Sequence, residues 1–156
     1  MTQQAADAGG TVDSALDAKS LESLLKRLTE WATAHRDVRA VALVGSYARG
    51  TPTTQSDVDL VILTTSPDKY LLDEQWIREL GLGKLVATKP WGAITERRLK
   101  RNDGLEIELG IGLPSWASTD PVDAGTQRVV RDGMRIAHDP DHLLRRLIET
   151  IESSSD

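Results

Sequence analysis

The sequence contains no cysteine. Disulfide bonds, thiolate catalysis and cysteine-ligated zinc sites are therefore excluded. Phenylalanine is also absent, so the bulky apolar packing falls to leucine, isoleucine, valine and four tryptophans. No apolar run approaches the roughly 20 residues needed to span a bilayer, and the first residues lack the basic start and apolar centre of a signal peptide. We expect a cytoplasmic protein with no membrane partner.

A strong excess of either charge is also missing, since 24 acidic residues stand against 19 basic ones. A mildly acidic chain is not attracted in bulk to nucleic acid, although a local basic patch is compatible with this total. The 156 residues suffice for one domain with a substantial core and are too few for two comfortable ones. We expect a mobile N-terminal tail over residues 1–12 and a single domain over residues 13–152.

Apolar spacing predicts both helices and strands. Three- and four-residue spacing, or a proline at a first helical position, predicts helices over residues 14–35, 67–80 and 142–151. The first of these helices has an alternative start at Ser20. Short apolar or alternating runs predict strands over residues 38–44, 57–63, 84–88, 93–101 and 105–111. Residues 114–125 are expected to form a long loop, and residues 128–137 either a short strand pair or a helix.

The last two predicted strands turn at Asn102-Asp103-Gly104. This tripeptide suits a three-residue hairpin loop with glycine in the left-handed conformation. A two-residue loop would set Leu99 against Glu108, whereas the three-residue loop places bases opposite acids and apolar side chains opposite each other. The predicted cross-strand pairs are Lys100 with Glu106, Leu99 with Ile107, and Arg98 with Glu108.

Residues 41–63, VALVGSYARGTPTTQSDVDLVIL, carry the strongest functional signal. Two apolar runs bracket a polar loop, and the second run begins with Asp57 and Asp59. Because side chains alternate along a strand, these two acids share one face, about 6–7 Å apart at the backbone. Neighbouring acids on an otherwise apolar strand would repel each other, and a divalent cation removes that repulsion. We therefore predict that Asp57 and Asp59 bind a metal ion.

A two-metal site for phosphoryl transfer needs carboxylates that bridge cations about 3.5–4 Å apart. A third acid usually comes from a neighbouring strand, and Glu106 and Glu108 share one face of the last predicted strand. Glutamate is depleted in strands, so two in one strand are unusual. We favour Glu108 because Ile107 and Leu109 flank it deeper in the strand. Glu106 is the fallback, and both glutamates have an alternative role as an exposed face paired with the hairpin's bases.

Gly45 and Ser46, between the first strand and the polar loop, are the candidate phosphate-binding residues. Glycine permits close approach of the backbone to an anion, and a following helical turn would direct N–H groups at it. The Ser46 hydroxyl can donate to a phosphate oxygen. Arg49 would add positive charge, and Arg98 lies near the phosphates if Glu108 faces the metal. The alternative for Gly45 and Ser46 is an ordinary turn that ends a strand.

These residues resemble a known family. The order of an apolar strand, Gly-Ser, a spacer, Asp-x-Asp and an acid on a later strand is similar to the nucleotidyltransferase superfamily of the DNA polymerase β type. The segment GSYARGTPTTQSDVDL is most similar to its minimal and antibiotic-modifying branches. The resemblance covers residues 41–63 well and residues 105–109 loosely. It implies an α+β, single-domain polymerase β-like fold in which helices flank a mixed sheet.

The resemblance also implies an activity. A nucleoside monophosphate, in the first place AMP, would pass from ATP or another nucleoside triphosphate to a hydroxyl acceptor on a small molecule or a protein, and pyrophosphate would be released. Asp57, Asp59 and Glu108 would be the catalytic carboxylates that hold two Mg²⁺ ions, and Ser46 would bind the β- and γ-phosphates. The expected nucleotide-binding set is Gly45, Ser46, Arg49, Ser56 and Arg98.

Two alternatives remain open because the chain lacks the large C-terminal helical domain of the antibiotic-modifying enzymes, which helps to bind the acceptor and supplies a base. One is an antitoxin-type minimal nucleotidyltransferase that modifies a toxin partner. The other is a nucleotide-binding module that has lost catalysis. The intact Ser46, Asp57 and Asp59 favour an enzyme.

Overall fold

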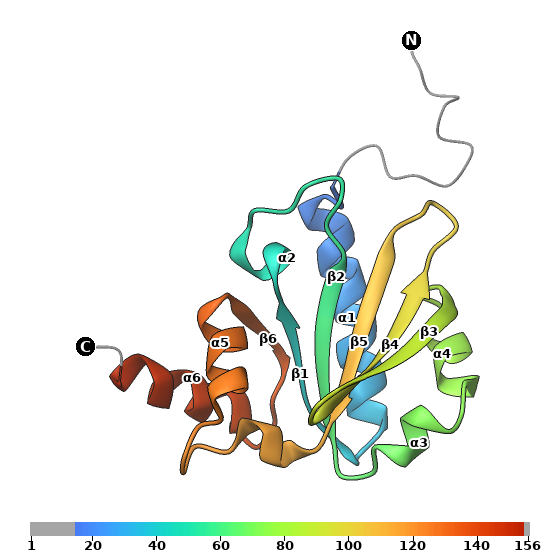
Figure 1. Ribbon diagram of the computed structural model, residues 1–156. Helices are drawn as coiled ribbons and strands as arrows, with labels where there is room; N and C mark the ends of the chain where they lie inside the picture. Colours follow the sequence, from blue (N-terminus) through green and yellow to red (C-terminus); the bar gives the residue numbers. More distant parts are fainter. Residues whose placement is uncertain (1–14, 155–156) are drawn as a thin grey trace.

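The computed structural model describes residues 15–154, so the tail predicted over residues 1–12 lies outside the described residues. Six strands form one sheet in the order β3-β4-β5-β2-β1-β6 (Figure 1). The strands are β1 (Val38–Val44), β2 (Val58–Thr64), β3 (Lys84–Trp91), β4 (Ile94–Lys100), β5 (Glu106–Gly112) and β6 (Met134–His138). The β2–β5 pairing is parallel and the other pairings are antiparallel, which confirms the predicted mixed sheet.

Helices cover both faces of this sheet. They are α1 (Ala18–Ala34), α2 (Ser46–Arg49), α3 (Asp68–Leu71), α4 (Gln75–Leu80), α5 (Ala124–Arg131) and α6 (Leu143–Ser153), with a short 3₁₀ helix, η2 (Pro114–Ala117). Figure 1 shows α1 behind the strands, and α5 and α6 beside β1 and β6. None of the helices in residues 15–154 is long and apolar enough to cross a membrane.

Helix α1 forms because its leucines lie on one face at helical spacing. Leu24, Leu28 and Trp31 are buried against the sheet. The helix begins later than the predicted residue 14, because the Asp17 carboxylate accepts a hydrogen bond from the Ser20 backbone N–H at 2.8 Å and so caps the first turn. The opposite face of the sheet packs against the apolar stripe of α6, which includes Leu147.

The single helix predicted over residues 67–80 is wrong, since the structure breaks it into α3 and α4. The backbone carbonyl of Tyr70 accepts hydrogen bonds from Trp76 Nε1 at 3.1 Å and Arg97 Nη1 at 2.8 Å. That carbonyl therefore serves tertiary contacts instead of continuing the helix. The buried Trp76 ring fills the resulting corner, and Asp73 accepts from the Gln75 N–H as the chain re-enters a helix.

The structure also refines several other predicted segments. Strand β3 is longer than predicted and includes Pro90, which an edge strand tolerates because one side of its backbone has no ladder partner. The loop predicted over residues 114–125 contains η2 and the start of α5. Residues 128–137, left open between a helix and a strand pair, divide between the end of α5 and β6.

The predicted hairpin register is confirmed. Strands β4 and β5 pair Lys100 with Glu106, Leu99 with Ile107 and Arg98 with Glu108. Gly104 has φ 92°, and its N–H donates to the Arg101 carbonyl at 3.0 Å. This register decides which side chains of β4 face the acids of β5.

Asp37, between α1 and β1, ties this connection to the end of β2 and to α3. Its carboxylate accepts hydrogen bonds from Thr64 Oγ1 at 2.7 Å, Tyr70 Oη at 2.7 Å and Lys69 Nζ at 2.9 Å. Burial raises the pKa of Asp37, but the hydrogen bonds from Lys69, Tyr70 and Thr64 together outweigh burial and lower the pKa to about 2. The ionised carboxylate is therefore part of the folded structure.

Replacing Asp37 with Asn should lower the free energy of unfolding at pH 7 by about 2 kcal/mol. A lowered pKa stabilises the folded state above the ordinary value near 3.8 and loses this effect as the pH falls toward about 2. Urea unfolding of both proteins between pH 7 and pH 2 checks this, with the exposed Asp120→Asn as a control of equal charge change. A difference between wild type and Asp37→Asn that does not shrink with acid would contradict the assignment.

Candidate functional site

Three carboxylates meet where β2 and β5 run side by side. Asp57 directly precedes β2, Asp59 lies within it, and Glu108 is the register partner of Asp59 on β5. One oxygen from each lies within 4.8 Å of the others. Strand β2 begins at Val58, one residue later than predicted, yet alternation still buries Val58 against the α1 face and leaves both aspartates on the other. The sequence-predicted metal set is thus brought together in space.

Asp59 is the most electrostatically isolated member of this group. No cation of the described residues makes an ion pair with it. Burial raises its pKa, and the nearby charge of Glu108 raises it further, to about 7. Burial and the charge of Glu108 also raise the pKa of Asp57. The cluster therefore holds more negative charge than the fold neutralises by itself.

Arg98 on β4 points into the cluster from the neighbouring strand. Its guanidinium donates to the carboxylates of Glu106 and Glu108, and Nη1 lies 3.4 Å from Asp57 Oδ2. The sequence left two positions open for Arg98, near the phosphates or paired with the glutamates of β5. The structure adopts the second, and it also brings Glu106 to the cluster's edge through the same guanidinium.

Gly45 separates β1 from α2 at a point of close approach. Its backbone has φ 78° and ψ −155°, a conformation that essentially only glycine adopts. A Cβ at this position would lie 2.8 Å from Asp59 Oδ2. Ser46 begins α2, which has only four residues, so the phosphate-binding prediction depends on Gly45 and the Ser46 hydroxyl more than on a helix dipole.

The two other predicted nucleotide-binding side chains have partners within the fold. Arg49 Nη1 donates to Asp132 Oδ2 at 2.8 Å and to the Asp132 carbonyl at 2.9 Å. Ser56 Oγ accepts a hydrogen bond from the Thr53 N–H at 2.9 Å, which closes the polar loop before Asp57. The structure therefore gives Arg49 and Ser56 local structural contacts, and their predicted role toward a nucleotide stays a prediction.

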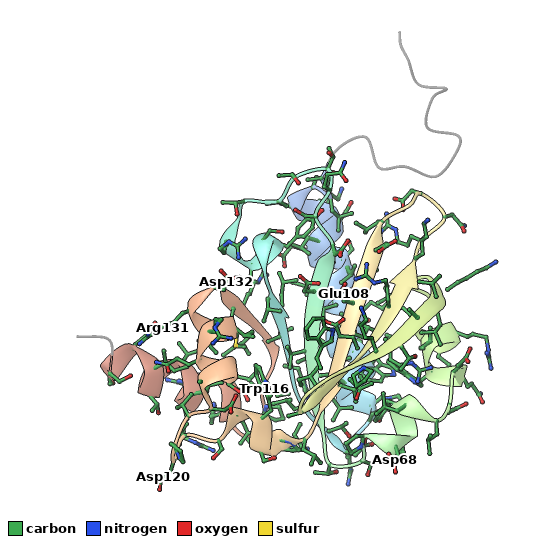
Figure 2. The ribbon with its side chains drawn as sticks, viewed as in Figure 1. Asp68, Glu108, Trp116, Asp120, Arg131 and Asp132 are labelled. Carbon is green, nitrogen blue, oxygen red and sulfur yellow. The ribbon has the colours of Figure 1, made fainter. Side chains whose placement is uncertain are left out.

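A cleft of about 800 Å³ opens beside Asp59 and Glu108. Its lining includes Trp91, Trp116 and Asp132, and Figure 2 shows Trp116 and Asp132 across from Glu108. Sequence reasoning missed the acidic members of the wall outside the metal set, because only the packing of α5 and β4 brings their segments to the site. These are Glu96, Asp123 and Asp132.

The motif and its surroundings match a known family. A family model described as a nucleotidyltransferase domain matches residues 21–107, more than half of the chain. The chain belongs to this nucleotidyltransferase family. The resemblance predicted from the sequence is therefore confirmed, and membership places the protein among the transferases. The matched span contains Gly45, Ser46, Asp57 and Asp59, and it ends one residue before Glu108.

Solved structures similar to this nucleotidyltransferase include an aminoglycoside 6-adenyltransferase from Bacillus subtilis (TM-score 0.48, 14% identity), the Cid1 poly(U) polymerase (0.43, 17%) and a CCA-adding enzyme of Thermotoga maritima complexed with tRNA (0.39, 21%). The matches cover 67%, 64% and 67% of this chain, which spans only 38%, 32% and 24% of those proteins. No curated protein sequence matches the chain significantly.

The donor set of this nucleotidyltransferase suits a hard divalent cation. Mg²⁺ prefers carboxylate oxygens and is usually bound through a few of them together with substrate phosphates. Asp57, Asp59 and Glu108 offer three such oxygens within 4.8 Å of one another. The raised pKa of Asp59 marks a half-buried carboxylate that the fold leaves without a counter-cation. The residues present therefore fit a magnesium site.

Proposed function

We propose that this domain is a Mg²⁺-dependent nucleotidyltransferase that moves a nucleoside monophosphate, in the first place AMP, from a nucleoside triphosphate to a hydroxyl acceptor and releases pyrophosphate. The observation that carries the proposal is the convergence of Asp57, Asp59 and Glu108 within 4.8 Å, next to Gly45. Family membership supports transferase chemistry, and the carboxylate geometry supports the metal-dependent form of it.

The chain's own residues divide the work between the phosphates and the metal. Ser46 would donate its hydroxyl hydrogen to the β- and γ-phosphates, and Gly45 would let the backbone approach them without a Cβ. Asp57, Asp59 and Glu108 would hold the divalent cations. These cations, when bound, supply positive charge to the phosphate oxygens. Catalysis of this kind depends on positioning and charge neutralisation more than on covalent chemistry.

The acceptor would bind in the cleft beside the carboxylates. The cleft has room for a small molecule or a protein side chain, and Trp91 and Trp116 offer apolar walls next to Glu108. The acceptor oxygen would form a bond to the α-phosphorus while the bond from that phosphorus to the pyrophosphate oxygen breaks, and the hydroxyl proton would pass to water. A toxin-like protein partner would be one acceptor of this kind.

The first experiment measures the melting temperature with ATP, GTP, CTP and UTP, each with Mg²⁺ or with excess EDTA. Ligand at a hundred times its dissociation constant adds about 2.7 kcal/mol, or roughly 5–10 °C for a domain of this size. We expect a magnesium-dependent rise with at least one nucleotide. Identical melting curves in every condition would contradict the proposal.

A nucleotide-binding module without catalysis is a second candidate. The contact of Arg98 with the carboxylates favours it, because the guanidinium occupies oxygens that the metal requires. Measurement of pyrophosphate release in the presence of candidate hydroxyl acceptors separates the two functions. Tight nucleotide binding without release across a broad acceptor panel would favour the module.

A further inference from the structure

Arg98 is held in the carboxylate cluster by the strand geometry. Alternation along β4 buries Arg97, which is 3% exposed, on the α1 face, and directs Arg98 to the face that carries the acids. The β4–β5 register then sets Arg98 directly opposite Glu108. The guanidinium is consequently placed by backbone pairing.

The guanidinium binds the same atoms that a divalent cation would need. It contacts Glu108 Oε2 and Glu106 Oε1 and lies 3.4 Å from Asp57 Oδ2. Two of the three carboxylates in the candidate metal set therefore already face a cation, and Asp59 alone does not. A forked guanidinium and a divalent cation compete for these oxygens, since both positive charges in one cluster of this size would repel each other.

We propose that Arg98 is a built-in counter-cation that keeps divalent metal out of the carboxylate cluster until a nucleoside triphosphate arrives. The side chain is 35% exposed, so it has space to leave the cluster. Phosphate oxygens bind guanidinium through two parallel hydrogen bonds, as carboxylates do, and so offer Arg98 a replacement partner. Metal and nucleotide then bind as a unit. This inference rests on the proposed metal-dependent function and adds a positioning residue to it.

The test measures Mn²⁺ binding to the nucleotide-free protein through the electron paramagnetic resonance signal of the Mn²⁺ that remains unbound. Arg98→Gln should bind Mn²⁺ roughly tenfold or more tightly than wild type, the factor that corresponds to one hydrogen bond to a charged group. Lys100→Gln is the matched control, because Lys100 lies two residues on along the same face and is exposed. It should stay within about threefold of wild type, since salt screens an exposed charge.

A double variant locates the bound metal. Asp59→Asn in the Arg98→Gln background should remove the gained Mn²⁺ affinity. If Arg98→Gln folds only when Mn²⁺ is present, the proposal is also supported. If it does not fold at all, Arg98→Lys replaces it, because a lysine keeps the charge but lacks the fork, and it should bind Mn²⁺ more tightly than wild type.

The outcomes separate this inference from the proposed function. Equal Mn²⁺ affinity of wild type and Arg98→Gln, together with magnesium-dependent nucleotide binding by wild type, overturns the inference and leaves the function intact. Tighter Mn²⁺ binding by Arg98→Gln with no binding of any nucleotide to wild type or variant supports Arg98 as the counter-cation but overturns both its release by a nucleotide and the transferase function. Equal affinity without nucleotide binding overturns both.

Discussion

Replacing Asp59 with Asn is expected to abolish magnesium-dependent nucleotide binding while leaving the metal-free protein at least as stable as wild type. The carboxylate is one of three candidate metal ligands, and loss of a metal's charge stabilisation is worth several kcal/mol. Transfer activity should therefore fall by roughly 10³-fold or more. The ionised Asp59 is meanwhile unfavourable in the empty site, because burial and the charge of Glu108 raise its pKa to about 7.

The stability difference between wild type and Asp59→Asn should depend on pH in a definite direction. A raised pKa means that the stability contributed by protonated Asp59 is present below its ordinary value near 3.8 and is lost as the pH rises through about 7. Below about pH 3.8 the wild-type side chain is protonated in both the folded and the unfolded protein and resembles Asn, so the two melting temperatures should be most alike there and should diverge as the pH rises toward about 7. At pH 8 in EDTA the Asn variant should melt at a higher temperature than wild type. The difference should be roughly 2–4 °C for each kcal/mol by which loss of the ionised carboxylate raises the free energy of unfolding.

The matched control for this experiment is Glu96→Gln. Glu96 lines the same cleft and accepts a hydrogen bond from Trp91 Nε1 at 2.9 Å, but it is not one of the three clustered carboxylates. Its variant should keep the magnesium-dependent rise in melting temperature. A rise that survives in Asp59→Asn, or that disappears equally in both variants, would sink the metal assignment.

Replacing Gly45 with Ala is expected to damage stability and the site together. The backbone at Gly45 has φ 78° and ψ −155°, which costs about 1–3 kcal/mol for a residue with a Cβ. The added methyl would also lie 2.8 Å from Asp59 Oδ2 and force that carboxylate to move. Urea unfolding should show the loss of stability, and magnesium-dependent nucleotide affinity should fall at least about tenfold, since displacement of one ligand costs more than 1.4 kcal/mol.

Gly50→Ala is the control that separates strain from displacement. Gly50 has the same φ of 78° with ψ 21°, and nothing lies within 4 Å of its added Cβ. This variant should lose about 1 kcal/mol of stability and keep its nucleotide affinity. Equal losses of affinity in the two variants would show that Gly45 acts only through general stability.

Local patterns predicted the site strands well and the connections poorly. The hairpin register of Arg98 with Glu108 followed from one turn tripeptide and from charge pairing, both of which are short-range. The break between α3 and α4 did not, because it depends on Arg97 of β4 reaching the Tyr70 carbonyl, together with the Trp76 ring from α4 itself. Tertiary hydrogen bonds of this kind leave no periodic signal in the sequence.

The candidate site shows the same division. Alternation and spacing were enough to place Asp57, Asp59 and Glu108 on one face, where the structure brings their oxygens together. The sequence left open whether Arg98 lies near the phosphates or pairs with the glutamates of β5. Alternation shows which face of the strand a side chain occupies, but it does not show which acidic side chain it contacts. The cleft walls from α5 and η2 were not predicted, because residues 114–125 carry no sequence pattern that indicates packing beside the carboxylates.

The single parallel pairing in the described sheet has a consequence for how the protein folds. The pairings of β1 with β2, β3 with β4 and β4 with β5 join strands that are neighbours in the sequence, whereas Val58 must find Ile107 across a long stretch of chain. Non-local pairing of this kind is slow to form. The like charges of Asp59 and Glu108 face each other across that seam and oppose its closure. The carboxylate cluster therefore needs a long-range pairing to form, and a folding intermediate made only of the pairs between sequence neighbours would contain no metal site.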